Sequence, residues 1–174
     1  GFGLSRWSMP ETYPSDAVLG PMVAITNEVA GSDGDIFSHA FKLLDLGPTT
    51  EGHRTLAAVV SAPENIRNLD QIRAANARLA DPRALPEEEA RRLARTQKVI
   101  VAIGASIHAS EVGGTQASTE LLHRLVTTTD PATLAVLQNV VIVLIPSLNP
   151  DGQRLITDWY EKYKGTAWEG GPMP

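Results

Sequence analysis

Residues 98–105 read Lys-Val-Ile-Val-Ala-Ile-Gly-Ala, and residues 140–145 read Val-Val-Ile-Val-Leu-Ile. Neither stretch alternates apolar with polar residues, a pattern that is typical of strands buried on both faces of a sheet. The residues between them predict a helix over about 111–127 and a shorter one from Asp130 onward. Because a strand, helix, strand crossover joins parallel neighbours, we expect the two stretches to form the parallel centre of one sheet.

The helix expected over 111–127 has a candidate core face. Ala117, Leu121 and Leu125 recur at steps of four, which predicts that these three residues face the sheet. His123 falls opposite this stripe, so we expect it on the surface.

Two shorter apolar runs upstream, residues 41–46 and 55–61, predict further strands. The connection Gly47-Pro48-Thr49-Thr50-Glu51-Gly52 is short enough for a hairpin, so these strands are expected to be antiparallel. Helices are expected from Pro63 to Asp81 and from Leu85 onward. The face of the first is predicted to carry Ile66, Leu69, Ile72 and Leu79. The fold class is therefore α/β, with a mixed sheet whose central strands are parallel and flanked by helices.

The two ends of the chain differ from this pattern. Residues 1–20 are rich in proline and predict an extended arm, followed by a short helix over 22–30. Residues 151–164 predict a last helix, and residues 165–174 a loop. We expect residues 21–174 to belong to one domain.

Composition excludes several classes of protein. The chain has 174 residues, of which 43% are hydrophobic and 20% charged, as in ordinary soluble domains. No run approaches the roughly 20 apolar residues of a membrane-spanning helix. The net charge is −5, and the basic residues clustered near 91–98 share their segment with the acids Glu87 to Glu89, which disfavours nucleic-acid binding. The absence of cysteine excludes a thiolate nucleophile and leaves the cellular compartment open.

His108 and Glu111 are the candidate metal ligands. They follow the first central strand and stand three apart at the start of a helix, so imidazole and carboxylate can face a common centre. Both groups are zinc ligands, and a catalytic zinc takes three protein ligands and a water. Only two ligands are visible here. A His-x-x-Glu spacing also arises by chance, so the position after a strand, at the ligand-binding rim of the sheet, matters more than the spacing.

Other polar residues have simpler interpretations. His39 is expected in a solvated loop, and His53 in a turn role. The turn Asn149-Pro150-Asp151-Gly152 follows the second central strand, and a turn with no further role is its default interpretation. Any function would be to shape a pocket wall and to offer Asn149 and Asp151 to a ligand. Ser106 lies near His108 without an acid that would complete a hydrolytic triad. Aromatic residues near the end of the chain suit either a substrate cleft or the core: Trp159, Tyr160, Tyr163 and Trp168.

Three landmarks occur in a familiar order. Residues 107–111 read Ile-His-Ala-Ser-Glu after one strand, and residues 146–152 read Pro-Ser-Leu-Asn-Pro-Asp-Gly after the next. Residues 46–53 are similar to a Gly-x-(Ser/Thr)-x-Glu-Gly-Arg hairpin, with His53 in place of the arginine. Together they resemble the zinc carboxypeptidases of peptidase family M14, over about residues 20–165.

The resemblance implies a carboxypeptidase-like domain in which Zn²⁺ is held by His108 and Glu111. It also implies that a zinc-activated water, deprotonated by a glutamate, attacks the carbonyl of a peptide or protein substrate. The family's third ligand, its Asn-Arg pair for the substrate carboxylate and its glutamate base all lie well beyond the Asn-Pro-Asp-Gly turn. We therefore expect these catalytic and substrate-binding residues beyond residue 174, so that residues 21–174 form an amino-terminal portion, incomplete at its C-terminus and inactive alone.

Two alternatives remain open at this point. The chain could be a non-catalytic, peptidase-like module that supplies a sheet and an interface to a larger assembly. On the leading interpretation, by contrast, a second chain or a missing C-terminal half completes the peptidase domain. It could also be an amidohydrolase relative that acts on N-acyl amino acids or cell-wall peptides. The resemblance suggests a secreted or extracytoplasmic location.

Overall fold

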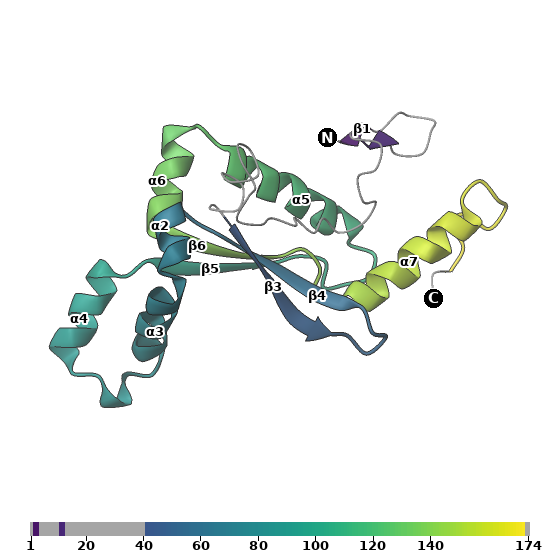
Figure 1. The fold of residues 1–174 in the computed structure, drawn as a ribbon. Coiled ribbons are helices and arrows are strands. Elements are labelled where there is room, and N and C mark those ends of the chain that lie inside the picture. Colours follow the sequence, from purple (N-terminus) through teal and green to yellow (C-terminus); the bar gives the residue numbers. More distant parts are fainter. Residues whose placement is uncertain (1, 4–10, 13–40, 173–174) are drawn as a thin grey trace.

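The computed structural model describes residues 2–3, 11–12 and 41–172 (Figure 1). The helix expected over 22–30 and the loop position expected for His39 lie outside these residues. In the range of the expected arm, β1 (Phe2–Gly3) pairs antiparallel with β2 (Glu11–Thr12).

A four-stranded sheet forms the centre of residues 41–172, in the order β3 (Phe41–Pro48), β4 (Arg54–Val60), β6 (Val140–Ile145) and β5 (Val99–Gly104). The hairpin β3–β4 is antiparallel, and β4 pairs antiparallel with β6. Strands β5 and β6 are parallel, with Val99 opposite Val140 and Gly104 opposite Ile145. The expected hairpin, the expected crossover and the mixed α/β architecture are thus confirmed.

Helices cover both faces of the sheet (Figure 1). The crossover from β5 to β6 consists of α5 (Val112–Thr127) and α6 (Pro131–Asn139). The segment before β5 consists of α2 (Pro63–Arg67), α3 (Leu69–Ala80), a 3-10 turn η1 (Pro82–Ala84) and α4 (Glu87–Thr96). The last helix, α7 (Pro150–Tyr163), is followed by turns up to residue 172.

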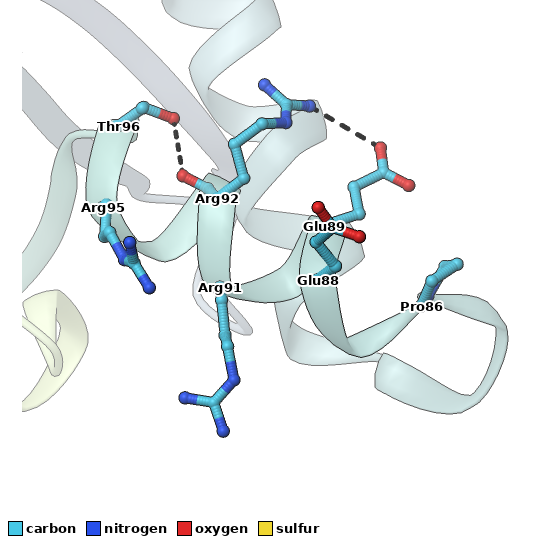
Figure 2. Close-up of a pocket in the computed structure, with 7 residues that line it drawn as sticks. All are labelled: Pro86, Glu88, Glu89, Arg91, Arg92, Arg95 and Thr96. Carbon is cyan, nitrogen blue, oxygen red and sulfur yellow. Dashed lines mark hydrogen bonds and ion pairs between the residues drawn. The ribbon is translucent and has the colours of Figure 1, made fainter.

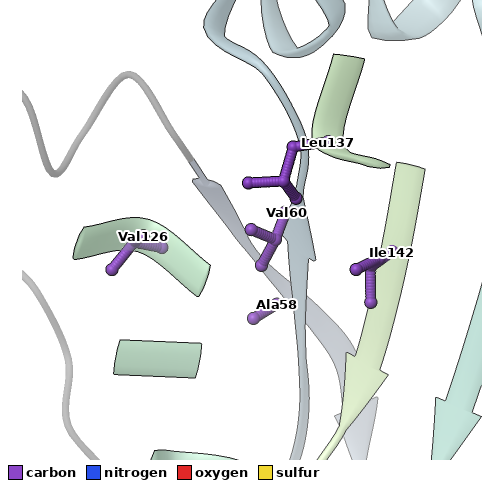
Figure 3. Close-up of a cluster of buried hydrophobic side chains, with 5 residues drawn as sticks. All are labelled: Ala58, Val60, Val126, Leu137 and Ile142. Carbon is purple, nitrogen blue, oxygen red and sulfur yellow. The ribbon is translucent and has the colours of Figure 1, made fainter. Parts of the chain in front are cut away.

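The alternation of side chains along the strands creates two apolar clusters, one on each face. Figure 3 shows the first, made of Ala58, Val60, Val126, Leu137 and Ile142. The second consists of Val59, Ile72 and Val141 and lies on the face covered by α3, with Ile66 and Leu69 packed against it as expected. Adjacent residues on β4 and β6 therefore serve opposite faces, and this alternation fixes the register of both strands.

The core face of α5 is rotated relative to the expected stripe. Ala117 is exposed and Leu121 is only half-buried, whereas Ser118 and Val126 are buried. Leu125, the third residue of the expected stripe, packs against the first cluster as expected. A helix has 3.6 residues per turn, so a stripe drawn at constant steps of four drifts away from the face that contacts the sheet. The buried face tolerates Ser118 because its hydroxyl donates to the Gly114 carbonyl.

The helix expected from Pro63 to Asp81 is interrupted at Asn68, which ends α2 and precedes α3. The preceding turn is anchored by Asn65, which is 5% exposed and donates to the carbonyls of Leu137 and Gln138 at 3.1 Å. These hydrogen bonds hold α2 against the end of α6. A separate helix, α3, begins at Leu69 and packs on the sheet through Ile72.

The expectation that β5 is buried on both faces is wrong. All six of its residues are exposed, and Val99 and Val101 reach 59% and 39%. The strand pairs with β6 on one side and is the last strand of the described sheet on the other. A run of apolar residues indicates that a strand needs to be covered, but which neighbours cover it depends on its place in the sheet.

Candidate metal site at the strand exits

The loops that leave β5 and β6 meet at one rim of the sheet, as their parallel pairing predicts. The Ala105 N–H donates to the Ile145 carbonyl at 3.0 Å, and the Leu148 N–H donates to the Ala105 carbonyl at 2.8 Å. Leu148 packs so closely over Gly104 that a Cβ there would lie 2.7 Å from Leu148 Cδ1. Gly104 therefore lets the two loops approach each other.

His108 and Glu111 converge in the loop after β5. Nδ1 of His108 lies 2.9 Å from Oε1 of Glu111, and the His108 N–H donates to Oε2 at 3.1 Å. Hydrogen bonds from the His108 side chain and then from its backbone hold the pKa of the Glu111 carboxyl below its usual value. This favours the ionised carboxylate, which is the form that binds cations.

The side chains of this pair fit a metal ion in type and access. They are 76% and 51% exposed, so an ion can reach both donor atoms from solvent. Tetrahedral zinc with bonds of about 2.1 Å needs donors roughly 3.4 Å apart, so the pair must open slightly to accept it. Among residues 41–172, no third His, Cys, Asp or Glu joins the pair in a group that could hold a metal.

Ser106 supports the turn that carries the pair, a role that sequence reasoning missed. It is 5% exposed and has a φ of 52°, in the left-handed region. Its Oγ donates to the Glu111 carbonyl at 2.6 Å and accepts from the Thr115 N–H at 3.1 Å. The possible signal was its short polar side chain just after a strand, a type that bonds readily to nearby backbone.

Asn149 and Asp151 make hydrogen bonds to other parts of the chain, as the turn interpretation of this segment expects. Oδ1 of Asn149 caps α7 by accepting from the Gly152 N–H at 2.9 Å. Asp151 accepts from the Thr49 hydroxyl at 2.5 Å and from the Glu51 N–H at 3.1 Å. Helix capping and turn bonding use the same oxygens that a ligand would need.

His53 lies in the hairpin turn, as expected, and its Nδ1 is 2.7 Å from Oδ1 of Asp151. Bonds from Thr49 first, and then from His53 and the Glu51 N–H, lower the pKa of the Asp151 carboxyl. His53 is thus a structural partner of Asp151. No local spacing signals this contact, because 98 residues separate His53 from Asp151.

The remaining candidates lie apart from this pair. His123 is exposed, as expected. The rings of Trp159 and Tyr163 lie 5.6 Å apart on α7, and both residues are half-buried, whereas Trp168 is 70% exposed. None of these three aromatic residues is therefore a fully buried core residue.

A hollow of about 590 Å³ lies over α4, and none of the site residues lines it (Figure 2). Its arginines are largely paired with acids: Arg91 binds Glu87 at 2.6 Å, and Arg92 lies 3.7 Å from Glu89. This pairing agrees with the expectation from sequence that the basic residues of this segment form no phosphate-binding stripe.

The chain matches the peptidase M14 family, described as zinc carboxypeptidase, over residues 34–169. This match covers most of the chain and includes both strand exits. The chain therefore belongs to the M14 zinc carboxypeptidase family.

Among individual proteins, the chain is similar to a different type of peptidase over a shorter stretch. It is 49% identical over 70 residues to the tricorn protease of Thermoplasma volcanium, and 44% identical over 70 residues to tricorn protease homolog 1 of Streptomyces coelicolor. Each match covers 40% of this chain, but only 7% and 6% of those relatives. The chain thus spans a small part of the curated relatives that it matches.

A solved structure, a metallo-carboxypeptidase from Burkholderia cenocepacia, superposes with a TM-score of 0.44 and 21% identity. The superposition covers 68% of this chain and 25% of that protein. Of the residues described, none forms a helix long and apolar enough to cross a membrane.

Proposed function

We propose that this chain supplies part of the active site of a zinc-dependent metallocarboxypeptidase, with His108 and Glu111 as two of three zinc ligands. The observation that carries the proposal is the 2.9 Å approach of His108 Nδ1 to Glu111 Oε1 at the rim where β5 and β6 end. The substrate is a peptide or protein, as the family membership suggests.

Zinc bound by this pair would supply a Lewis acid and lower the pKa of a bound water toward about 7. The task of the chain is to hold one imidazole and one ionised carboxylate side by side. The hydrogen bond from the His108 N–H keeps Glu111 turned toward the imidazole at 3.1 Å. The exposure of both side chains leaves room for a third ligand and for substrate.

The third ligand and the catalytic base are not assigned within residues 41–172. We propose that they come from a segment or chain that joins the domain at the strand exits. The similarity to tricorn proteases, one of whose relatives is named a C-terminal subunit, is compatible with assembly from several parts. On this proposal, the 174 residues alone bind zinc weakly and hydrolyse no peptide.

Peptidase assays on the complete protein that contains this chain test the proposal. His108→Ala and Glu111→Gln should each abolish chelator-sensitive release of C-terminal residues from peptides, with a loss of at least about 100-fold. His123→Ala is the matched control, because it removes an exposed imidazole from the same part of the chain. Full activity in His108→Ala, or equal loss in His123→Ala, would refute the assignment.

A non-catalytic, peptidase-like module is the second candidate, and the exposure of β5 favours it. A strand with all six residues exposed, and with no neighbour on its outer side among the strands that the structure describes, is suited to bind a further strand. On this reading, His108→Ala leaves the function of the assembly intact, whereas charged substitutions on β5 prevent assembly. Co-purification of the complete complex with each variant separates the two candidates.

A further inference from the structure

Ser106 is the only non-glycine residue with a positive φ among those that the structure describes. Left-handed backbone is unfavourable for a residue with a Cβ, and it persists where surrounding contacts hold it. At Ser106, these contacts are the hydrogen bonds of its own buried hydroxyl. Ser106 precedes His108 by two residues. The strained position therefore adjoins the candidate metal site.

The hydroxyl is inserted in the first turn of α5. In an uninterrupted turn, the Thr115 N–H would donate to the carbonyl of Glu111, four residues earlier. Here the Thr115 N–H donates to Ser106 Oγ, and the Ser106 hydroxyl donates to that Glu111 carbonyl. Ser106 thus stabilises the helix start in place of a side-chain cap.

This arrangement leaves the Glu111 carboxylate free for His108. Glu111 occupies the N-cap position of α5, yet its side chain makes no capping hydrogen bond. Both of its oxygens contact His108 instead, one at the imidazole and one at the backbone N–H. Without the Ser106 hydroxyl, the carboxylate would be drawn toward the unsatisfied N–H groups of the helix start.

The Thr115 hydroxyl connects Ser106 to the loop that leaves β6. Its Oγ1 lies 2.9 Å from Ser106 Oγ, 2.7 Å from the Pro146 carbonyl and 2.9 Å from Gln153 Oε1. These groups belong to the β5 exit, the β6 exit and the first turn of α7. Close packing adds to the constraint, since a Cβ at Gly114 would lie 3.1 Å from Ser106 Oγ.

We propose that Ser106 is a positioning residue, whose inserted hydroxyl holds His108 and Glu111 side by side so that both can reach one metal ion. Thr115 fixes this arrangement relative to α7. The inference rests on the proposed function of the pair as zinc ligands, and it concerns a residue that itself touches neither metal nor substrate.

Two substitutions separate the hydroxyl from the backbone conformation. Ser106→Ala removes the hydroxyl and retains a Cβ, whereas Ser106→Gly removes the hydroxyl and adopts positive φ without strain. Ser110→Ala, at an exposed position of the same loop, is the matched control. Zn²⁺ is titrated into the 174-residue chain and its affinity measured from backbone amide shifts by NMR. We expect both Ser106 variants to bind Zn²⁺ about tenfold more weakly, and Ser110→Ala to bind it unchanged.

The outcomes distinguish this inference from the proposed function. Native affinity in Ser106→Gly would overturn the role of the hydroxyl. If Ser106→Ala does not fold, the Zn²⁺ affinity of Ser106→Gly alone tests the role of the hydroxyl. If the unaltered chain shows no His108-dependent Zn²⁺ binding, the proposed function fails. The metal-free spectra then test positioning: displaced amide signals at His108 and Glu111 in Ser106→Gly support it, and unmoved signals overturn it.

Discussion

Nδ1 of His53 lies 2.7 Å from Oδ1 of Asp151, so the turn between β3 and β4 is fastened to the first turn of α7. The Thr49 hydroxyl, the Glu51 N–H and the His53 ring all converge on this one carboxylate. Because Asp151 follows the loop that leaves β6, this contact ties that loop to the hairpin at the edge of the described sheet opposite β5.

Replacing Asp151 by Asn should lower the melting temperature, and the loss should depend on pH. The pKa of the Asp151 carboxyl is lowered in the folded state, first by Thr49 and then by His53. The Asp151 carboxylate therefore stabilises the folded state above the pKa of the unfolded chain, about 3.9. This stabilisation is lost as the pH falls through the lower pKa of the folded state. Melting curves of both proteins between pH 3 and 7, in steps of about half a unit, measure this. If the difference in melting temperature between the unaltered chain and Asp151→Asn grew as the pH fell toward 3, the prediction would be wrong.

Gly104→Ala should destabilise the domain by about 1 kcal/mol, because the new Cβ would meet Leu148 at 2.7 Å. Leu148 is 45% exposed and can move aside, which keeps the cost small. Urea unfolding of Gly104→Ala, with and without Leu148→Ala, tests the contact, and the second substitution should recover part of the loss. Gly113→Ala is the control: nothing lies within 4 Å of its added Cβ, so this helical position should be neutral or stabilising. Equal losses at both glycines would refute the explanation.

Ser147→Ala should leave stability unchanged or raise it by up to about 1 kcal/mol. The Ser147 hydroxyl oxygen is buried and has no hydrogen-bond partner among the residues that the structure describes. Ser61 provides the contrast, since its buried hydroxyl lies 3.0 Å from the Leu137 carbonyl and 2.8 Å from that of Val140. Ser61→Ala should lose about 1–3 kcal/mol in the same urea titration. A larger loss at Ser147 than at Ser61 would show that Ser147 has an essential partner.

Val101→Lys should reduce self-association of the isolated chain with little change in stability. Val101 lies in the middle of the exposed strand β5 and is 39% exposed, so the lysine side chain can reach solvent. A charge on an edge strand disfavours pairing with another strand. Sedimentation velocity over a range of concentrations measures association, and thermal melting measures stability. Val141→Lys, at a position 1% exposed, should instead unfold the chain. Similar effects at the two positions would contradict the exposure of β5.

Local sequence predicts the strand pairs and the convergence of His108 with Glu111. The apolar runs, the short hairpin connection and the helical crossover fix which segments are strands and which neighbours are parallel. The convergence of His108 and Glu111 then follows from their spacing of three residues at the start of a helix. Each of these inferences needs only residues that are near in sequence, or a topological rule that has few exceptions.

Sequence fails where the partner is set by packing between distant segments. The contact between His53 and Asp151 requires the placement of a hairpin turn relative to a helix, which no pattern encodes. The apolar run of β5 gave a correct strand but a wrong burial, because the strand lies at the edge of the described sheet. Ser106 was missed for a different reason: its role comes from a left-handed φ, which is a property of the folded turn.

The position of β6 has a consequence for synthesis on the ribosome. This strand lies between β4 and β5, yet it is translated after both of them. Until Ile145 emerges from the exit tunnel, the two earlier strands lack the neighbour that joins them, and their apolar side chains stay available to chaperones. Nascent chains that end before residue 140 should therefore show no protected β4 amides in hydrogen exchange, whereas chains released after α7 should protect them.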